Sequence, residues 1–295
     1  MKKTIFKGAG VALVTPMKND GSVDYETLGK LIDFQLENET DAIISCGTTG
    51  ESATLTPAEH SKVIEFTINK VNGKIPVIAG TGSNCTAKAL EASKEAEKLG
   101  ADGLLIVTPY YNKTSQKGLV SHYNLIADSV STPIILYNVP SRTGVNIKPE
   151  TYKILSKHPN IVAAKEANGD ISSVAKTISL CGEDLNIYSG NDDQIVPMLS
   201  LGAIGVISVL SNVCPKECHE IVSKYLNGEV KESAKMQLEY LELIEMLFCD
   251  VNPIPVKAAM NMMGYSCGKC RLPLESLGEA QMVSLKNAMK KHNLI

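Results

Sequence analysis

The chain has 295 residues, of which 44% are hydrophobic and 21% are charged, and this composition can support a sizeable buried core. The formal net charge of −3 and the lack of a long basic run argue against nucleic acid or an anionic membrane as the main partner. No stretch of about 18 apolar residues occurs, so we expect no membrane-spanning helix. The N-terminal segment imitates a signal peptide, but Lys7 interrupts its apolar part and no clean cleavage site follows. We therefore expect a cytoplasmic protein.

Eight short apolar runs follow one another along the chain, at residues 10–16, 42–46, 76–80, 103–107, 133–137, 161–165, 185–189 and 204–209. They show no polar alternation and are followed by turn-forming residues, as expected for strands that are buried on both faces. Helices are expected between them, at about 25–37, 56–69 and 86–99 and from about residues 115, 148 and 170. The capping box Thr56-Pro-Ala-Glu59 begins one of these helices, Gly100 ends the next, and Asp170 caps a later one.

Eight such units in about 210 residues predict a (β/α)8 (TIM) barrel, an α/β fold. A doubly wound open sheet would be expected to have fewer strands and a glycine-rich phosphate fingerprint after the first one, where this sequence has none. The later pattern is purely helical, with segments at 215–227, 230–250, 255–263 and 278–292. We interpret residues 1–224 as the barrel and residues 225–295 as a C-terminal helical extension that packs on it.

The eight cysteines do not suggest a metal or redox site. Cys46, Cys181 and Cys249 lie within apolar patterns, as buried structural thiols do. Cys267 and Cys270 form a single CxxC pair, whereas a zinc site requires a second pair or histidines at ligand spacing. The sequence therefore predicts no metal and leaves the role of this pair open.

In a (β/α)8 barrel the residues that follow the strands form the active-site face. Here they are rich in glycines and hydroxyl groups and lack carboxylate pairs and clustered histidines. Metal-assisted hydrolysis, a Ser/His/Asp triad and a P-loop are therefore not expected. The side chains that remain available for chemistry are Thr48, Thr49, Tyr110, Tyr111, Tyr137, Arg142 and Lys165.

Lys165 ends the sixth apolar run, in the stretch IVAAKEANG. A lysine there either extends its head group into water or is partly desolvated, and desolvation makes the nucleophilic free amine accessible. Keeping an amine neutral near pH 7 costs about 4 kcal/mol, so burial suggests a function, and Schiff-base catalysis is one. The N–H groups of residues 47–50 can bind an anion, and Arg142 can bind a carboxylate. Each residue alone has an ordinary structural explanation, but together they point to aldol chemistry on small keto acids.

Five motifs carry a resemblance to the dihydrodipicolinate synthase family over essentially the whole chain: GTTGES at 47–52, TPYYN at 108–112, YNVPSRTG at 137–144, AAKEANGD at 163–170 and SGNDD at 189–193. The chain is also similar to the wider acetylneuraminate-lyase superfamily of class I aldolases, and Arg142 is the more discriminating residue. The resemblance implies condensation of pyruvate with L-aspartate 4-semialdehyde to 4-hydroxy-tetrahydrodipicolinate, the committed step of diaminopimelate and lysine biosynthesis. It implies no cofactor, because the substrate forms a covalent imine on Lys165.

The resemblance also implies the catalytic roles. Lys165 forms the Schiff base with pyruvate, and Tyr137 moves protons during imine formation and aldol addition. Thr48 and Tyr111 complete a proton relay with Tyr137, and Tyr111 comes from the neighbouring subunit of a tight dimer. The implied assembly is a homo-oligomer, a dimer of dimers.

Substrate-binding roles follow in the same way. Thr49 and the backbone at Ile207 hold pyruvate, Arg142 binds the carboxylate of the semialdehyde, and Gly190 leaves room for the bound substrate.

Lysine-inhibited members of the family have an allosteric pocket at the dimer interface, and the residues that suit it here are Ser52, Ala53, His60, Asn84 and Tyr110, with Lys88 as a further position of the pocket. Pro57 and Lys88 stand where sensitive members often have histidine and glutamate. A cation in place of an anion repels the ammonium of a bound lysine, so we expect weak or absent feedback inhibition.

Two alternatives remain open from the sequence. Another pyruvate-dependent class I aldolase, such as acetylneuraminate lyase or a 2-keto-3-deoxy sugar acid aldolase, would share the lysine and Tyr137. A non-catalytic keto-acid sensor would retain the fold without the reaction.

Overall fold

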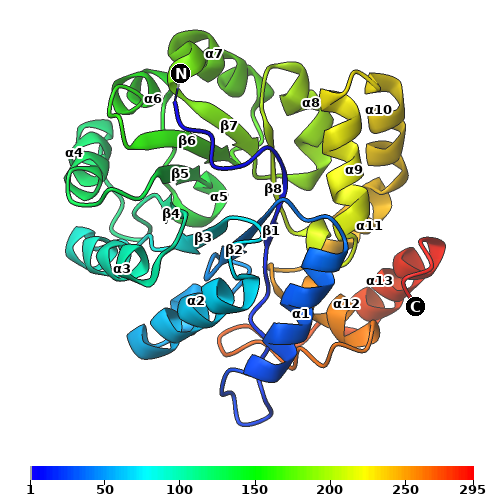
Figure 1. Cartoon of the computed structure of the whole chain (residues 1–295). Helices are drawn as coiled ribbons and strands as arrows, with labels where there is room; N and C mark the ends of the chain where they lie inside the picture. The colour runs from blue at the N-terminus through cyan, green and yellow to red at the C-terminus, as the bar shows by residue number, and fades with distance from the viewer. Residues whose placement is uncertain (1) are drawn as a thin grey trace.

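Eight parallel strands close into a barrel in the order β1 to β8, and β8 pairs back with β1 (Figure 1). The computed structural model describes residues 2–295. The strands are β1 (Gly8–Ala12), β2 (Ala42–Ser45), β3 (Val77–Gly80), β4 (Gly103–Val107), β5 (Ile134–Asn138), β6 (Ile161–Glu166), β7 (Asn186–Ser189) and β8 (Gly205–Ser208). The predicted (β/α)8 barrel is confirmed.

The strands are almost completely buried because each of their faces contributes to an apolar cluster. Inside the barrel, residues such as Ile44, Ile78 and Ile135 pack together, and Phe6 stacks on Tyr188 with ring centroids 4.4 Å apart. On the outer face, residues such as Ile43 and the other outward-facing strand residues pack under the helices. The alternation of side chains along a strand therefore separates an inner from an outer core.

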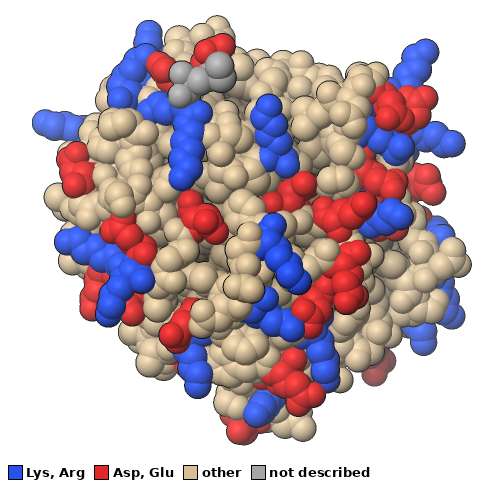
Figure 2. Space-filling model, in the orientation of Figure 1, with Lys and Arg blue, Asp and Glu red and all other residues tan. Residues whose placement is uncertain are grey.

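Helices surround the barrel (Figure 1). Those that follow the strands are α1 (Tyr25–Glu37), α2 (Pro57–Val71), α3 (Thr86–Leu99), α4 (Gln116–Ala127), α5 (Pro140–Thr143), α6 (Pro149–Leu155), α7 (Ile171–Cys181), α8 (Ile195–Ser200) and α9 (Pro215–Leu226). No helix within residues 2–295 is long and apolar enough to cross a membrane. Basic and acidic side chains are interspersed over the face of the molecule seen in Figure 2, in keeping with the small net charge of −3.

The predicted helix signals are confirmed. Thr56 and Glu59 form both hydrogen bonds of a capping box at the start of α2. Asp170 caps α7 by accepting a hydrogen bond from the N–H of Ser173. Gly100 ends α3 with φ at 93°, a left-handed conformation that costs glycine little.

Three sequence predictions differ from the structure. The first strand is Gly8–Ala12 and not the run at 10–16, because Gly8 and the residues after it pair with β8. The helix predicted at 230–250 is two helices, α10 (Val230–Glu239) and α11 (Leu241–Leu247). They separate at Tyr240, whose ring stacks on His292 with centroids 4.2 Å apart. The short helix α5 lies in a segment where the sequence predicted no helix.

The C-terminal extension consists of α10, α11, α12 (Ile254–Met262) and α13 (Glu279–Lys291). Buried residues such as Val256, Ala259 and Leu285 belong to the same apolar cluster as the outer face of the barrel. The extension therefore packs on the barrel as part of one core. The predicted division after residue 224 falls inside α9 and stays a prediction.

Candidate active site

Lys165 lies inside the barrel near the end of β6 and is 5% exposed. It is the register partner of Tyr137 on β5, so both side chains point to the interior from adjacent strands. Its Nζ atom lies 4.5 Å from the centroid of the Tyr137 ring, an arrangement that allows cation–π attraction. Within residues 2–295 no carboxylate forms an ion pair with this ammonium, whereas Lys257, another buried lysine, does have such a partner.

Asp192 is a fully buried acidic residue that is influenced by the charge of Lys165. Its Oδ2 accepts hydrogen bonds from the N–H groups of Val209 and Leu210, just beyond β8. Burial raises the pKa of Asp192, while the hydrogen bonds and the charge of Lys165 oppose this shift. Asp192 therefore links the segment after β7 to the end of β8, and the sequence reading gave it no role.

The turn after β2 carries Thr48 and Thr49. The N–H of Gly50 donates to the carbonyl of Gly47 at 3.1 Å, and the N–H of Glu51 donates to the carbonyl of Thr48 at 3.1 Å. Thr49 is 3% exposed, and its Oγ1 accepts a hydrogen bond from Nδ2 of Asn252 at 3.0 Å. A hydroxyl that accepts this bond keeps its own proton free for another acceptor.

Tyr111 is not brought into the site of its own chain. It is 91% exposed and has φ at 66°, an uncommon backbone conformation for a bulky residue. Within residues 2–295, no hydrogen bond joins Tyr137 to Thr48 or to Tyr111, so the implied proton relay stays a prediction. An aromatic ring held out in solvent on a left-handed residue is consistent with a role in another subunit.

Gly190 follows β7 and lies against Lys165. A Cβ atom at this position would be 2.7 Å from Cβ of Ala167 and 3.1 Å from Cε of Lys165. A side chain at this position would therefore crowd Ala167 and press on Lys165, which adds to the implied role of leaving room for substrate. Ile207 is fully buried on β8, where its register partner is Gly10.

Arg142 lies on α5 with an exposed side chain, and its Nη2 donates to the carbonyl oxygen of Asn252 at 3.2 Å. Asn252 thus contacts both Thr49 and Arg142, which were predicted to bind different substrates. The sequence reading missed Asn252. The signal was the segment Asn252-Pro-Ile-Pro-Val-Lys257, where two prolines and a lysine interrupt an apolar helical pattern.

Glu166 is the next residue after Lys165 and points outward, because successive strand residues face opposite sides. Its carboxylate accepts hydrogen bonds from Asn138 at 2.9 and 3.1 Å, from the hydroxyl of Tyr152 at 2.9 Å and from the N–H of Asn168 at 3.0 Å. Burial raises the pKa of Glu166 to about 7, although these hydrogen bonds oppose the shift. Glu166 therefore braces β5 against β6 from outside the barrel and does not reach the interior.

Comparisons with known proteins show the family of this chain. The family model described as the dihydrodipicolinate synthetase family matches residues 5–292. The chain belongs to this family. A relative from Caldicellulosiruptor bescii named 4-hydroxy-tetrahydrodipicolinate synthase is 58% identical over 99% of this chain and 98% of its own. A relative of the same name from Caldicellulosiruptor saccharolyticus is 60% identical over 97% of this chain and 96% of its own.

A solved structure of this family from Acinetobacter baumannii, a chloride-inhibited dihydrodipicolinate synthase complexed with pyruvate, superposes with a TM-score of 0.97. Its sequence is 43% identical, and the match covers 99% of this chain and 100% of the other. Dihydrodipicolinate synthetase family members are class I aldolases that use neither a metal nor a cofactor.

The positions suggested for the allosteric pocket of the dihydrodipicolinate synthetase family lie on the segments that follow β2, β3 and β4, with His60 in α2 and Lys88 in α3. Nε2 of His60 lies 2.8 Å from the carbonyl of Gly80, and the carbonyl of Asn84 accepts a hydrogen bond from Asn112 at 3.0 Å. Ala53 and Lys88 are exposed, Ser52 is half-buried and Tyr110 is 36% exposed. These contacts bring the segments together but do not test whether lysine binds.

The surroundings of the CxxC pair disfavour the thiolate form of both cysteines. Burial raises the pKa of the Cys267 thiol to about 12 and that of the Cys270 thiol to about 11, so both stay protonated near neutral pH. Within residues 2–295, no group of three His, Cys, Asp or Glu side chains has an arrangement that could hold a metal.

Proposed function

We propose that this chain condenses pyruvate with L-aspartate 4-semialdehyde to give 4-hydroxy-tetrahydrodipicolinate, the committed step of diaminopimelate and lysine biosynthesis. The observation that carries the proposal is a buried lysine without a carboxylate partner, 4.5 Å from the ring of Tyr137, in a member of a class I aldolase family. The nitrogen of Lys165 has no ion pair to break before it attacks a carbonyl carbon.

In the proposed mechanism, the Lys165 amine adds to the keto carbon of pyruvate and water leaves, which forms the imine. Loss of a proton from the methyl carbon gives an enamine, whose carbon then attacks the aldehyde. The amino group of the semialdehyde attacks the imine carbon, closes the ring and releases the lysine. Tyr137 is the neighbouring group suited to give and take protons during these steps. A phenol has an ordinary pKa of about 10 and is a poor base alone, so the mechanism includes a relay through Thr48 and Tyr111.

We assign pyruvate binding to Thr49 and the backbone at Ile207. The assignment of Thr49 is supported by its hydrogen bond from Asn252, which turns the lone pairs of the hydroxyl toward the protein and leaves its proton for a carboxylate. Arg142 is assigned to the carboxylate of the semialdehyde, since a guanidinium binds a carboxylate through two parallel hydrogen bonds.

Tyr111 is proposed to act in the site of a neighbouring subunit, within a dimer of dimers. Its 91% exposure supports this role, because the ring has little use in its own chain. Co-expression of Tyr111→Phe with Tyr137→Phe tests it. A mixed dimer would contain one complete site and regain activity, and inactive mixed dimers would contradict the assignment.

A coupled assay with pyruvate and L-aspartate 4-semialdehyde tests the function. Treatment with pyruvate and borohydride should add a stable mass to the peptide that contains Lys165, and Lys165→Met protein should not be labelled. Labelling without turnover of the semialdehyde would replace this function by another pyruvate aldolase activity. Absence of labelling would leave no support for an imine mechanism.

Weak or absent inhibition by lysine remains part of the proposal, because exposed Lys88 lies where a bound ammonium would be repelled. Calorimetric titration should give little heat with L-lysine. Tight binding would contradict the proposal, and a Lys88→Glu variant should bind lysine more tightly than the parent chain.

A further inference from the structure

The turn that carries Thr48 and Thr49 is held from the C-terminal extension through Glu51. This glutamate is 4% exposed and has φ at 55°. Its Oε1 forms an ion pair with Nζ of Lys257 at 2.8 Å. Its Oε2 accepts a hydrogen bond from the N–H of Arg271 at 2.8 Å. Both carboxylate oxygens of Glu51 are therefore fixed by residues more than 200 positions later in the chain.

Lys257 makes a further hydrogen bond within the C-terminal extension. It is 1% exposed, and its Nζ also donates to the carbonyl of Lys269 at 2.9 Å. The ammonium thus connects α12, the turn after β2 and the segment between α12 and α13. A buried cation with these partners has one arrangement, because any movement of Glu51 would leave a buried charge unpaired.

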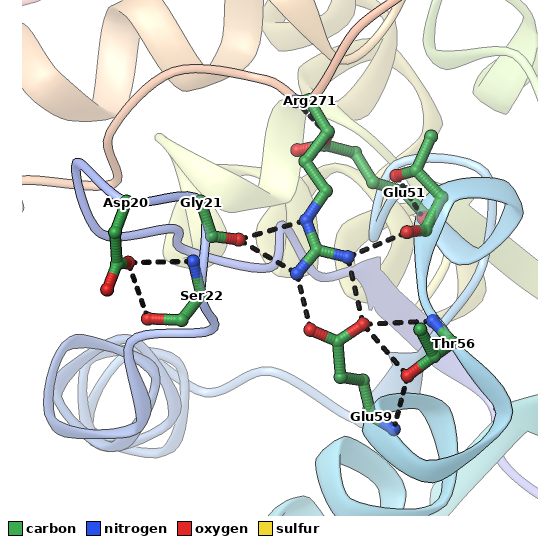
Figure 3. A network of polar contacts seen from close by, with 8 residues as sticks. Asp20, Gly21, Ser22, Glu51, Thr56, Glu59 and Arg271 are labelled. Atoms are coloured by element: carbon green, nitrogen blue, oxygen red, sulfur yellow. Dashed lines mark hydrogen bonds and ion pairs between the residues drawn. The ribbon is translucent and has the colours of Figure 1, made fainter.

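Arg271 fastens the chain just beyond this turn (Figure 3). Its guanidinium donates to the carbonyl of Thr54 at 2.6 Å. The two carboxylate oxygens of Glu59 accept further hydrogen bonds from it at 2.9 and 2.5 Å. It also donates to the carbonyl of Gly21 at 3.0 and 2.8 Å. The hydrogen bonds from Arg271 hold the pKa of Glu59 down at about 2, so this carboxylate stays charged over the working range of pH. The segment 51–59 is therefore held at Glu51, Thr54 and Glu59.

Thr48 and Thr49 are each held by a hydrogen bond to this network or to the adjoining extension. The N–H of Glu51 donates to the carbonyl of Thr48 at 3.1 Å, so the position of Glu51 sets the position of Thr48. Thr49 is held by Nδ2 of Asn252, five residues before Lys257 on the same segment of the extension. Among these contacts, the charge of Lys257 is the one that stability alone does not explain, because apolar side chains of similar volume can stabilise a core as well as a buried ion pair.

We infer that Lys257 is a positioning residue for the reaction: through its ion pair with Glu51 it holds Thr48 and Thr49 where they act on pyruvate. This inference rests on the proposed function. It assigns Lys257 no contact with substrate. The effect is expected on the pyruvate half of the reaction, since the bond of Arg142 to Asn252 does not involve the ion pair.

The test compares the wild-type chain with Lys257→Met and with Glu51→Gln combined with Lys257→Met. The single variant leaves Glu51 buried without its cation and can fail to fold, so the double variant decides. In the double variant neither charge of this ion pair is left buried, and the amide oxygen of Gln at position 51 can still accept from the N–H of Arg271. Leu285→Ala is the matched control, because it removes a fully buried side chain of the same extension without touching the turn.

For the double variant we expect a melting temperature near that of the wild type but a fall in kcat/KM for pyruvate of about 10- to 100-fold, as small misplacements of binding groups produce. The KM for the semialdehyde should change by less than about threefold, and borohydride trapping of pyruvate on Lys165 should slow in parallel with kcat/KM for pyruvate. Leu285→Ala should lower the melting temperature and leave all these constants unchanged.

A stable double variant with wild-type constants for pyruvate would overturn the inference, because the ion pair would then be structural only. Equal losses for both substrates would overturn it as well, since the defect would not be confined to the turn. Absence of turnover by the wild-type chain would contradict the proposed function, and that result is obtained separately from the comparison of variants.

Discussion

Two buried lysines of this chain have opposite surroundings. Lys165 is 5% exposed and faces the ring of Tyr137, with no ion pair within residues 2–295. Lys257 is 1% exposed and is held by Glu51 and the carbonyl of Lys269. Burial alone therefore does not mark a nucleophile. The difference is whether the nitrogen is already engaged, and a nitrogen without partners is available to form a covalent bond.

The largest expected effect comes from removing the unpaired lysine. Lys165→Met should lower kcat by about 10⁴-fold or more, because no imine can form. Steady-state kinetics with both substrates and the loss of borohydride labelling measure this effect. Residual activity within about tenfold of the wild type would show that the nucleophile lies elsewhere.

Tyr137→Phe tests the partner of that lysine. The ring and its packing remain, but the hydroxyl that moves protons is lost, so kcat should fall by about 10²- to 10⁴-fold. Imine formation should slow as well. Its rate can be measured by rapid mixing with pyruvate and quenching with borohydride. Unchanged kinetics would restrict Tyr137 to packing against Lys165.

The order of the two lysines should be reversed when stability is measured: replacing Lys257 should lower the free energy of unfolding more than replacing Lys165. Lys257→Met leaves the carboxylate of Glu51 buried and unpaired, which should lower the free energy of unfolding by about 3–5 kcal/mol. Lys165→Met removes a buried nitrogen that has no ion pair to lose, and stability should stay within about 1 kcal/mol of wild type or increase. Urea denaturation at one fixed protein concentration provides the comparison, because oligomers unfold with concentration-dependent midpoints. Equal losses in both variants would remove the distinction.

Glu166, the residue after Lys165, should make the stability of the protein depend on pH. Burial raises its pKa from 4.5 to about 7, so the folded protein binds this proton more tightly than the unfolded chain. Its contribution to stability is complete below pH 4.5 and is lost as the pH rises through about 7, a change of about 3 kcal/mol. Glu166→Gln should remove that part of the pH dependence and be more stable than wild type at pH 8.

The exposed glutamate at position 91 provides the control, and Glu91→Gln should leave the pH dependence of stability unchanged. The account of Glu166 would be contradicted if the free energy of unfolding changed equally in the wild type and in Glu166→Gln between pH 4.5 and 7.

The smallest expected effect concerns Arg142, which distinguishes the proposed reaction from sugar-acid aldolases. Arg142→Ala should raise the KM for the semialdehyde by about 10- to 100-fold, the value of a charge-assisted bond to a carboxylate, and change the KM for pyruvate little. An unchanged KM for the semialdehyde would assign its carboxylate to another group.

The barrel could be predicted from the sequence because its strands are continuous apolar runs and its helices begin at local signals such as Thr56 and Asp170. Lys165 could be singled out for the same reason, since its position at the end of a buried run is local information. The partners of Glu51 could not, because the ion pair with Lys257 joins residues 206 positions apart. The break at Tyr240 was missed as well, and the ring of this residue stacks on His292, which lies far along the chain.

The bond between Glu51 and Lys257 also has a consequence for the order in which the molecule is made. Every residue proposed to contact the substrates lies at or before residue 207, so a ribosome has delivered all of them well before Lys257 and Arg271 emerge. A nascent chain can thus close its barrel and bury Lys165 while the turn with Thr48 and Thr49 still lacks its restraint. On this view full catalytic competence depends on the last 45 residues, because they contain Lys257 and Arg271.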